Sequence, residues 1–384
     1  MPPSYFIVCR CLVALMLCSV LFTAMPARGD SSLMVYVGTY TGPKSKGIYV
    51  MRMDPATGAL TEPQLAGEVG NPSFLAIHPT QKWLYAVSET GGKMGGTVSA
   101  FSIASDTGKL LLLNQQSTGG DGPCFVGLDP AGKTALVANY GGGSVESLPI
   151  GDDGKLGSPA SFIQHTGKGT DSKRQEGPHA HSINSDPGGH FAFACDLGLD
   201  KVLSYRLDGS SKLSSNDPPF TTIAAGSGPR HLSFHPSGKF AYVISEMACT
   251  VTAFSYDAQK GALSEIQTIT TLPAGYHGPA NCAEVQVHPS GKFLYGANRE
   301  HNSLAIFTID EQTGKLTAAG HQASGGKTPR NFRMDPAGNF LLAAHQDSDS
   351  VVVFRIDQKT GGLTPTGATV KIGSPVCVKF VEAK

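Results

Sequence analysis

The chain has 384 residues, and its 30 lysines and arginines are balanced by 30 aspartates and glutamates, so its formal net charge is zero. Nucleic acids and anionic membranes both select proteins with an excess of positive charge, and the composition therefore argues against either as a partner.

Residues 1–29 have the pattern of a secretory signal peptide: a positively charged first segment, an apolar run over residues 11–25, and small residues for cleavage at 26–29. The apolar run is shorter than the roughly 20 residues that span a bilayer, so a transmembrane anchor is the weaker interpretation. A lipid anchor at Cys18 is disfavoured because the bulky Leu17 precedes it. We expect an exported chain, periplasmic or secreted, without stable membrane insertion after cleavage. A cytoplasmic location follows only if this interpretation is wrong.

Residues 30–384 begin with three strand patterns, in which β-branched and aromatic residues alternate with small or polar ones. These predicted strands are Met34–Tyr40, Gly47–Met53 and Ala59–Leu65. They match the second, third and fourth strands of a unit that recurs along the rest of the chain, so the first strand of their own unit has to come from elsewhere.

The recurring unit is clearest at residues 228–268. Its first two strands are joined by a tight turn in which Pro236 sets φ and Gly238 is free to take a positive φ. Strand residues on either side alternate between apolar and polar character, as expected for strands with one buried face. The four predicted strands of this copy are Arg230–Phe234, Phe240–Ile244, Thr250–Tyr256 and Ala262–Thr268.

The turn proline recurs at intervals of 47 to 57 residues, which suits a four-stranded antiparallel unit and excludes the shorter helical repeats. A seventh first strand, Pro375–Phe380, lacks its turn, and its pairing with Met34–Tyr40 would leave no strand edge open. The sequence therefore predicts an all-β fold: one seven-bladed β-propeller domain over residues 30–384, with four antiparallel strands per blade, closed by pairing of the N- and C-terminal strands. The six turn prolines are Pro79, Pro130, Pro187, Pro236, Pro289 and Pro336.

In each predicted blade the start of the first strand and the end of the second lie on one face, beside the central channel. Two rings of residues should therefore converge there. The polar loop at 166–177 lies on the same face. We expect it either to form a wall of the site or to be disordered. The first ring is Ser73, Cys124, His181, Arg230, Ala283, Arg330 and Val376. The second is Glu89, Tyr140, Leu197, Glu246, Arg299, Gln346 and Tyr40, and the residues just before it include Asn139 and Asp196.

Ionisable residues of these positions form an arc over adjacent blades. Charges beside a narrow channel need a partner or a ligand, so we interpret the arc as a binding or catalytic site. The alternative is a set of inter-blade ion pairs that serve only the fold, in which Arg230 pairs with Glu246 while Arg299 pairs with Asp196 or Glu284. The arc contains His181, Asp196, Arg230, Glu246, Arg299 and Arg330, with Glu284 one residue beyond its ring position.

Motifs for bound phosphate, zinc and calcium are missing: the chain has no G-x-x-x-x-G-K-[ST], no H-E-x-x-H, no C-x-x-C and no aspartate-rich loop. We therefore expect neither a metal nor a cofactor.

Five cysteines lie outside the predicted signal, an odd number without close pairing, so buried free thiols are expected in place of a disulfide framework. They are Cys124, Cys195, Cys249, Cys282 and Cys377.

The whole chain after the signal resembles the seven-bladed propeller lactonase family, whose members include bacterial 6-phosphogluconolactonases and fungal carboxymuconate-lactonising enzymes. The resemblance implies a site at His181, Arg230, Glu246 and Arg299, which belong to the arc described above. The segments that carry it include VGTYTG at Val37, ANYGGGSV at Ala138, RQEGPHAHS at Arg174, GPRHLSFHPSGKFAYVISE at Gly228, AEVQVHPSGKFLYGANR at Ala283 and GGKTPRNF at Gly325.

We expect a monomeric lactone hydrolase for an anionic sugar lactone, of the 6-phosphogluconolactonase type. Glu246 is the first choice as the base that activates water, and His181 competes with it. Arg230 and Arg299 would hold the anion and stabilise the tetrahedral oxyanion. Further contacts to the substrate are expected from Asp196, Arg330, Glu284, Asn139 and Gln346.

Three alternatives remain open at this stage. The first is an exported lactonase for an unphosphorylated sugar lactone, and the second is an isomerase that forms lactones from muconates. The third is a non-catalytic binding or scaffold propeller, which should carry large aromatic or apolar residues across the channel face. The charged arc argues against the third.

Overall fold

The computed structural model describes residues 1–4, 32–91 and 95–382, which belong to two units, 1–30 and 31–384. Residues 1–4 contain no helix or strand. The rest of the predicted signal peptide lies outside the described residues, so its assignment stays a prediction. No helix in the described part of the chain has the length and apolar character needed to cross a membrane.

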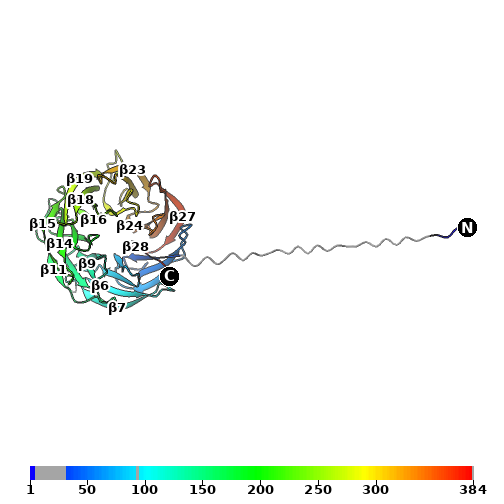
Figure 1. The fold of residues 1–384 in the computed structure, drawn as a ribbon, viewed down its shortest axis with the longest axis horizontal. Coiled ribbons are helices and arrows are strands. Elements are labelled where there is room, and N and C mark those ends of the chain that lie inside the picture. The colour runs from blue at the N-terminus through cyan, green and yellow to red at the C-terminus, as the bar shows by residue number, and fades with distance from the viewer. Residues whose placement is uncertain (5–31, 92–94, 383–384) are drawn as a thin grey trace. The chain divides into compact units, whose positions relative to one another are not determined.

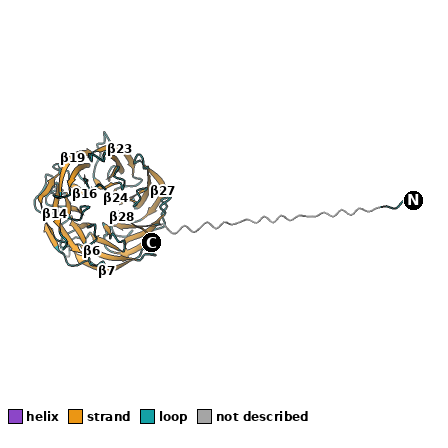
Figure 2. Ribbon diagram, in the orientation of Figure 1, coloured by secondary structure: helices purple, strands orange, loops and turns teal. Residues whose placement is uncertain are grey.

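The described residues of the unit 31–384 form seven four-stranded antiparallel sheets and no helix, and the sheets stand in a ring (Figures 1 and 2). This confirms the predicted all-β, seven-bladed β-propeller. The blades, from inner to outer strand, are β4 (Leu75–Ile77), β5 (Trp83–Ser88), β6 (Thr97–Ile103), β7 (Leu110–Ser117); β8 (Pro123–Leu128), β9 (Thr134–Asn139), β10 (Ser144–Pro149), β11 (Ser161–Gln164); β12 (Ala180–Ser185), β13 (Phe191–Asp196), β14 (Lys201–Leu207), β15 (Leu213–Thr222); β16 (Pro229–Phe234), β17 (Phe240–Ser245), β18 (Thr250–Asp257), β19 (Ala262–Thr270); β20 (Cys282–Val287), β21 (Phe293–Asn298), β22 (Ser303–Ile309), β23 (Leu316–Ala323); β24 (Pro329–Met334), β25 (Phe340–His345), β26 (Ser350–Ile356), β27 (Leu363–Lys371); and β28 (Pro375–Glu382), β1 (Leu33–Thr39), β2 (Gly47–Met53), β3 (Gln64–Glu68).

The seventh blade is assembled from both ends of the chain. Strand β28 pairs antiparallel with β1 from Leu33 opposite Glu382 to Thr39 opposite Pro375, which confirms the predicted closure. The predicted fourth strand at residues 59–65 is wrong, because the observed strand β3 starts only at Gln64. Pro63 has no N–H to donate to a ladder, so regular pairing resumes after it.

Adjacent blades are tied together by repeated polar contacts as well as by their apolar faces. Four buried tyrosines on second strands each donate a hydrogen bond to a glycine carbonyl in the outer turn of the next blade. Three histidines at the inner turns contact the corresponding turn of the next blade in the same way. A buried phenol needs such a partner, so these contacts fix the angle between neighbouring blades. The tyrosine pairs are Tyr36–Gly108, Tyr85–Gly154, Tyr242–Gly314 and Tyr295–Gly361, at 2.8, 2.9, 3.1 and 2.8 Å.

The five cysteines of the described chain are all buried and free, as predicted. Each lies in or directly beside a strand, and burial raises the pKa of the thiols of Cys124, Cys195, Cys282 and Cys377 above the ordinary value. The thiol forms therefore pack as small apolar side chains and are poor nucleophiles at neutral pH.

Removal of residues 375–384 should prevent formation of the closed ring, because it deletes β28 and leaves the whole of β1 as an open edge. We expect an insoluble chain or one without cooperative thermal unfolding. A chain that lacks residues 1–29 retains all the described strands and serves as the control. A truncated chain that melts cooperatively at the temperature of this control would show that closure is dispensable.

Candidate active site

β-Bulges at the start of inner strands determine which side chains enter the channel. In the β8, β12, β16 and β24 blades the ladder pairs the first and third residues of the inner strand and skips the second. A bulge leaves the skipped residue out of the ladder and redirects its side chain. The four skipped residues, Cys124, His181, Arg230 and Arg330, all line the central channel.

Residues that directly follow second strands form the other wall. Glu89, Tyr140, Glu246 and Arg299 follow β5, β9, β17 and β21, so the two predicted rings meet here. They enclose a cavity of about 260 Å³, which we call the site cavity. It is lined by Glu89, Cys124, Tyr140, Arg174, His181, Glu246, Asn281, Arg299 and Arg330. A narrower pocket that shares four of these residues adds Tyr40, Ser73, Arg230 and Val376 among others.

Glu246 is the centre of the charge arrangement. Its side chain is only 6% exposed and contacts three guanidinium groups. Arg174 Nη2 donates to Oε1 at 2.7 Å, and Arg230 Nε donates to Oε2 at 3.1 Å. Arg299 Nη2 lies 3.0 Å from Oε2 as an ion pair, but without hydrogen-bond geometry, and its Nε has no hydrogen-bond partner among the described residues. Arg299 thus keeps donors free beside the cavity.

The protonation state of Glu246 follows from two opposed effects. Burial by itself raises the pKa of this carboxyl, but the three guanidiniums outweigh burial and lower the pKa from 4.5 to about 2. Burial, together with nearby Arg330 and Arg299, lowers the pKa of Arg230 to about 10, which still leaves that guanidinium charged at neutral pH. The site therefore holds two carboxylates, Glu246 and Glu89, among a larger number of guanidiniums, and this excess of positive charge suits an anion.

His181 stands beside this cluster as a neutral imidazole. Its Nε2 lies 3.9 Å from Glu246 Oε2, and its Nδ1 lies 3.6 Å from the Cys124 sulfur. Tyr140 packs edge-on against the ring, with 5.2 Å between ring centroids. Burial and the charge of Arg230 hold the pKa of His181 well below 6.5, so the ring can accept a proton at neutral pH.

A chain of hydrogen bonds connects Glu246 with a second carboxylate further along the channel. Arg230 Nη1 lies 3.2 Å from His231 Nε2, and because a guanidinium can only donate, that nitrogen accepts. The ring proton of His231 is then on Nδ1, which donates to Glu284 Oε1 at 3.2 Å. Burial lowers the pKa of His231 to about 4 and keeps this ring neutral. The chain fixes the orientation of the Arg230 guanidinium toward Glu246.

A second set of hydrogen bonds at the site joins the blades of β24, β1 and β5. Arg330 Nη2 donates to the Tyr40 hydroxyl at 3.1 Å, and Tyr40 donates to Glu89 Oε2 at 3.0 Å. Burial and the Glu89 carboxylate, opposed by Arg330, raise the pKa of Tyr40 to about 12. Tyr40 is therefore a neutral hydrogen-bonding group at the cavity wall.

The loop at residues 166–177 is ordered and forms a wall of the site cavity, the first of the two predicted alternatives. Gln175 accepts hydrogen bonds from the backbone of Thr170 and Asp171 and donates to Leu197 O, which ties the loop to the β12 blade. Asp171 caps the turn that precedes Arg174. The loop thereby places the Arg174 guanidinium on Glu246.

Four residues predicted to contact the substrate do not line the site cavity. Asn139 donates to Thr118 O and Ser144 Oγ, and Asp196 pairs with His165 at 2.6 Å in a fully buried network. Glu284 lies at the far end of the hydrogen-bond chain, and Gln346 is also absent from the lining. The structure likewise corrects the expected partners of Arg299, which pairs with Glu246 and with neither Asp196 nor Glu284.

Sequence reasoning missed Arg174 and Asn281, and it left Glu89, Tyr40 and Tyr140 without a role. The last three belong to the predicted rings, but they lie outside the adjacent blades in which the charged residues of those rings cluster. Arg174 had a usable signal, since it is an arginine in a long polar loop on the site face.

Among the described residues, no group of three His, Cys, Asp or Glu side chains is arranged to hold a metal ion.

The fold and the site together define a seven-bladed β-propeller whose central channel carries carboxylates, a histidine and several arginines. The comparisons specify the family: a family model described as lactonase, 7-bladed beta-propeller, matches residues 34–380. The chain belongs to this seven-bladed β-propeller lactonase family, as the sequence resemblance indicated.

Three relatives illustrate the range of the family. A 6-phosphogluconolactonase of Bacillus subtilis is 38% identical over 346 residues, which cover 90% of this chain and 97% of the relative. A 6-phosphogluconolactonase of Formosa agariphila is 35% identical over 78% of this chain and 86% of its own. The solved structure of a periplasmic gluconolactonase of Pseudomonas aeruginosa is 34% identical, with a TM-score of 0.87 over 92% of this chain and 100% of that one.

Glu246 should make stability depend on acid pH. Because its pKa is lowered from 4.5 to about 2, its stabilising contribution is fully present above pH 4.5 and is lost as the pH falls toward 2. Glu246→Gln should melt below the wild type at pH 7, since three guanidiniums lose their counter-charge. The difference in Tm between the two proteins should shrink as melts are repeated from pH 5 down to pH 2.

Glu62→Gln, which changes an exposed carboxylate, is the matched control and should follow the wild type at every pH. A constant Tm difference between Glu246→Gln and the wild type over the whole range would contradict the ion cluster described here.

Proposed function

We propose that the protein hydrolyses a sugar lactone to the corresponding aldonic acid. The observation that carries the proposal is the pairing, in one cavity, of a neutral histidine with an ionised glutamate and several guanidiniums. Hydrolysis of a lactone needs a proton acceptor for the attacking water and positive charge for the oxyanion that forms, and this cavity offers both. The names of the relatives, 6-phosphogluconolactonase and gluconolactonase, support the same reaction class.

We infer that His181 takes the proton from the attacking water. Glu246 accepts hydrogen bonds from two guanidiniums and is ion-paired with a third, and a pKa of about 2 makes that carboxylate a poor proton acceptor. His181 is neutral, and its Nε2 faces the Glu246 carboxylate across 3.9 Å. Glu246 would therefore stabilise the imidazolium as it forms, in the way that the carboxylate of a catalytic triad supports its histidine.

The covalent steps then follow in order. Water adds to the lactone carbonyl carbon as its proton moves to His181, and the carbonyl oxygen becomes an oxyanion. Arg299, whose side chain lines the site cavity and is 13% exposed, supplies the donor for that oxyanion. The tetrahedral intermediate collapses, the bond from the carbonyl carbon to the ring oxygen breaks, and the ring oxygen takes the proton back from His181. The product is an open-chain hydroxy acid.

The substrate proposal has two forms, which differ by a phosphate group. Arg174, 39% exposed at the edge of the site cavity, could hold a phosphate of 6-phosphogluconolactone. Export through the predicted signal would favour an unphosphorylated lactone, in line with the periplasmic gluconolactonase among the relatives. We propose an exported, monomeric enzyme of carbohydrate metabolism. To test the two forms of the substrate proposal, hydrolysis of 6-phosphogluconolactone and of glucono-1,5-lactone by the chain from residue 30 is measured side by side.

His181→Gln should lower kcat on the better of the two lactones by about 10²-fold or more, the usual scale for loss of a general base. Gln has similar size and no basic nitrogen, so Tm should change little. The matched control is His190→Gln, an exposed histidine in the turn of the same blade. An unchanged kcat for His181→Gln would remove this residue from the mechanism.

Arg299→Ala should lower kcat and raise KM, because the proposed mechanism gives its guanidinium both the substrate anion in the ground state and the oxyanion that forms in the transition state. The effect should be larger for 6-phosphogluconolactone than for glucono-1,5-lactone. Melting temperatures measured on the same variant distinguish a role of Arg299 in substrate binding from a role in the stability of the fold alone. A variant that melts early but keeps the wild-type kcat and KM would show that Arg299 serves only the ion cluster.

A further inference from the structure

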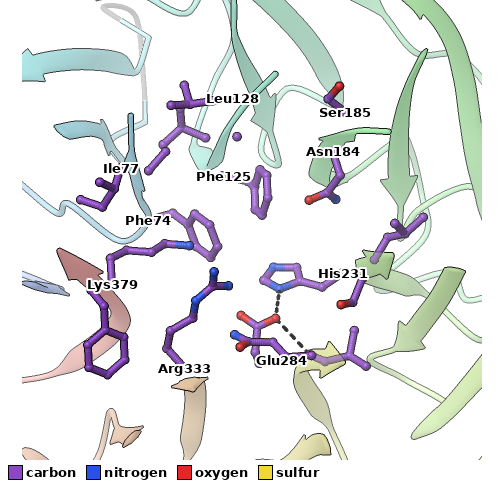
Figure 3. Close-up of a pocket in the computed structure, with 18 of the residues that line it drawn as sticks. Phe74, Ile77, Phe125, Leu128, Asn184, Ser185, His231, Glu284, Arg333 and Lys379 are labelled. Atoms are coloured by element: carbon purple, nitrogen blue, oxygen red, sulfur yellow. Dashed lines mark hydrogen bonds and ion pairs between the residues drawn. The ribbon is translucent and has the colours of Figure 1, made fainter. Parts of the chain in front are cut away.

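The channel opens into a second cavity at the opposite face of the propeller. This far cavity has a volume of about 530 Å³ and lies among the turns that join first and second strands, because Pro79, Pro130 and Pro336 are part of its lining. The inner strands begin at the site cavity and end here. Figure 3 shows its centre, with side chains from several blades pointing inward.

Aromatic rings separate the far cavity from the site cavity. Phe74 stacks on Phe125 with 4.3 Å between ring centroids, and the His231 ring packs edge-on against both at 5.6 and 5.5 Å. His181, on the site side, packs against the other side of this group at 5.4 Å from His231. The proposed lactonase chemistry uses none of the side chains beyond this layer.

A third ring of residues lines the far cavity, three positions beyond the first ring along each inner strand. It contains two cations and no carboxylate. The cations, Arg333 on β24 and Lys379 on β28, occupy equivalent positions in adjacent blades. The ring is Ala76, Gly127, Asn184, Ser233, Gln286, Arg333 and Lys379.

Neither cation has an anionic partner. In the part of the chain that the structure describes, the side chains of Arg333 and Lys379 make no ion pair and no hydrogen bond. Lys379 Nζ instead lies 4.6 Å from the centroid of the Phe74 ring. Both side chains point into the cavity in Figure 3. Burial and the nearby Arg333 lower the pKa of Lys379, and the Glu284 carboxylate opposes this shift from beyond ion-pair distance.

The two carboxylates of the cavity wall are committed elsewhere. Glu284 accepts from His231, from Asn331 and from its own neighbouring backbone N–H. Asp129 accepts from three backbone N–H groups of its turn. The wall is therefore left with two uncommitted cations beside apolar rings, and an anion with an organic body satisfies both features.

We propose that the far cavity is a binding site for a small anion, whose phosphate or carboxylate group is held by Lys379 and Arg333 and whose remaining atoms pack against Phe74. The proposal rests on these residues alone and does not depend on the reaction at the site cavity. It assigns a second ligand site to the other mouth of the channel.

Calorimetric titration at fixed ionic strength tests the proposal, with inorganic phosphate and gluconate as separate probes. Four proteins are compared: the wild type, Lys379→Met with Arg333→Met, a control in which the exposed Lys359 and Arg206 are changed to Met, and Arg299→Met. The control removes the same charge elsewhere, and Arg299→Met weakens anion binding in the site cavity. At least one probe should bind the wild type, the control and Arg299→Met, with affinity about tenfold or more weaker in the Lys379 and Arg333 double variant.

Binding of phosphate alone assigns the site to phosphate groups, and binding of gluconate alone assigns it to carboxylates. Arg333→Glu, a change at an exposed position, should weaken binding even if the double variant is poorly folded. The proposal is overturned if neither probe binds the wild type, if the control loses affinity as much as the double variant, or if only Arg299→Met loses it. Lactone hydrolysis should be unchanged in the double variant, so the test stands apart from the proposed function.

Discussion

The pairing of β1 with β28 is the interaction on which the rest of the structure depends. It joins the two ends of the chain within one blade and gives that blade four strands, like each of the other six. Closure also gives all seven inner strands a common channel, since each strand begins at one mouth and ends at the other. The contact of Arg330 with Tyr40, 290 residues apart in sequence, exists only because the ring is closed.

Within that channel, one carboxylate organises the charges. Glu246 receives guanidiniums from its own blade, from the next blade and from the loop at 166–177, so the site is shared among three separate parts of the chain. A buried ion cluster of this kind adds little stability over apolar packing, and its value lies in the fixed positions of the charges. The hydrogen bonds from Arg230 through His231 to Glu284 extend this order through the aromatic layer toward the far cavity.

The closure was predictable because the N-terminal strands lack an inner strand that the C-terminal segment supplies. The blade count and the order of the strands were predictable because each blade is built from hairpins between residues close in sequence. Alternating side chains and turn residues encode such hairpins locally. The pair of Arg230 and Glu246 was predictable for the same reason, since both residues lie at the same end of one hairpin, 16 residues apart. The family resemblance pointed to the same side chains without specifying their geometry.

The sequence by itself thus determined the propeller, its ring closure and the rings of residues that face the channel. Only the tertiary structure decided which members of those rings meet. Side chains alternate across a strand, so Tyr140 enters the cavity while Asn139, one residue earlier, donates hydrogen bonds to Ser144 and to Thr118 O. The contact of Arg174 with Glu246, 72 residues further along the chain, depends on how the loop at 166–177 packs against a neighbouring blade. Local residue patterns carry no information about such contacts, because the contacts exist only once the ring has closed.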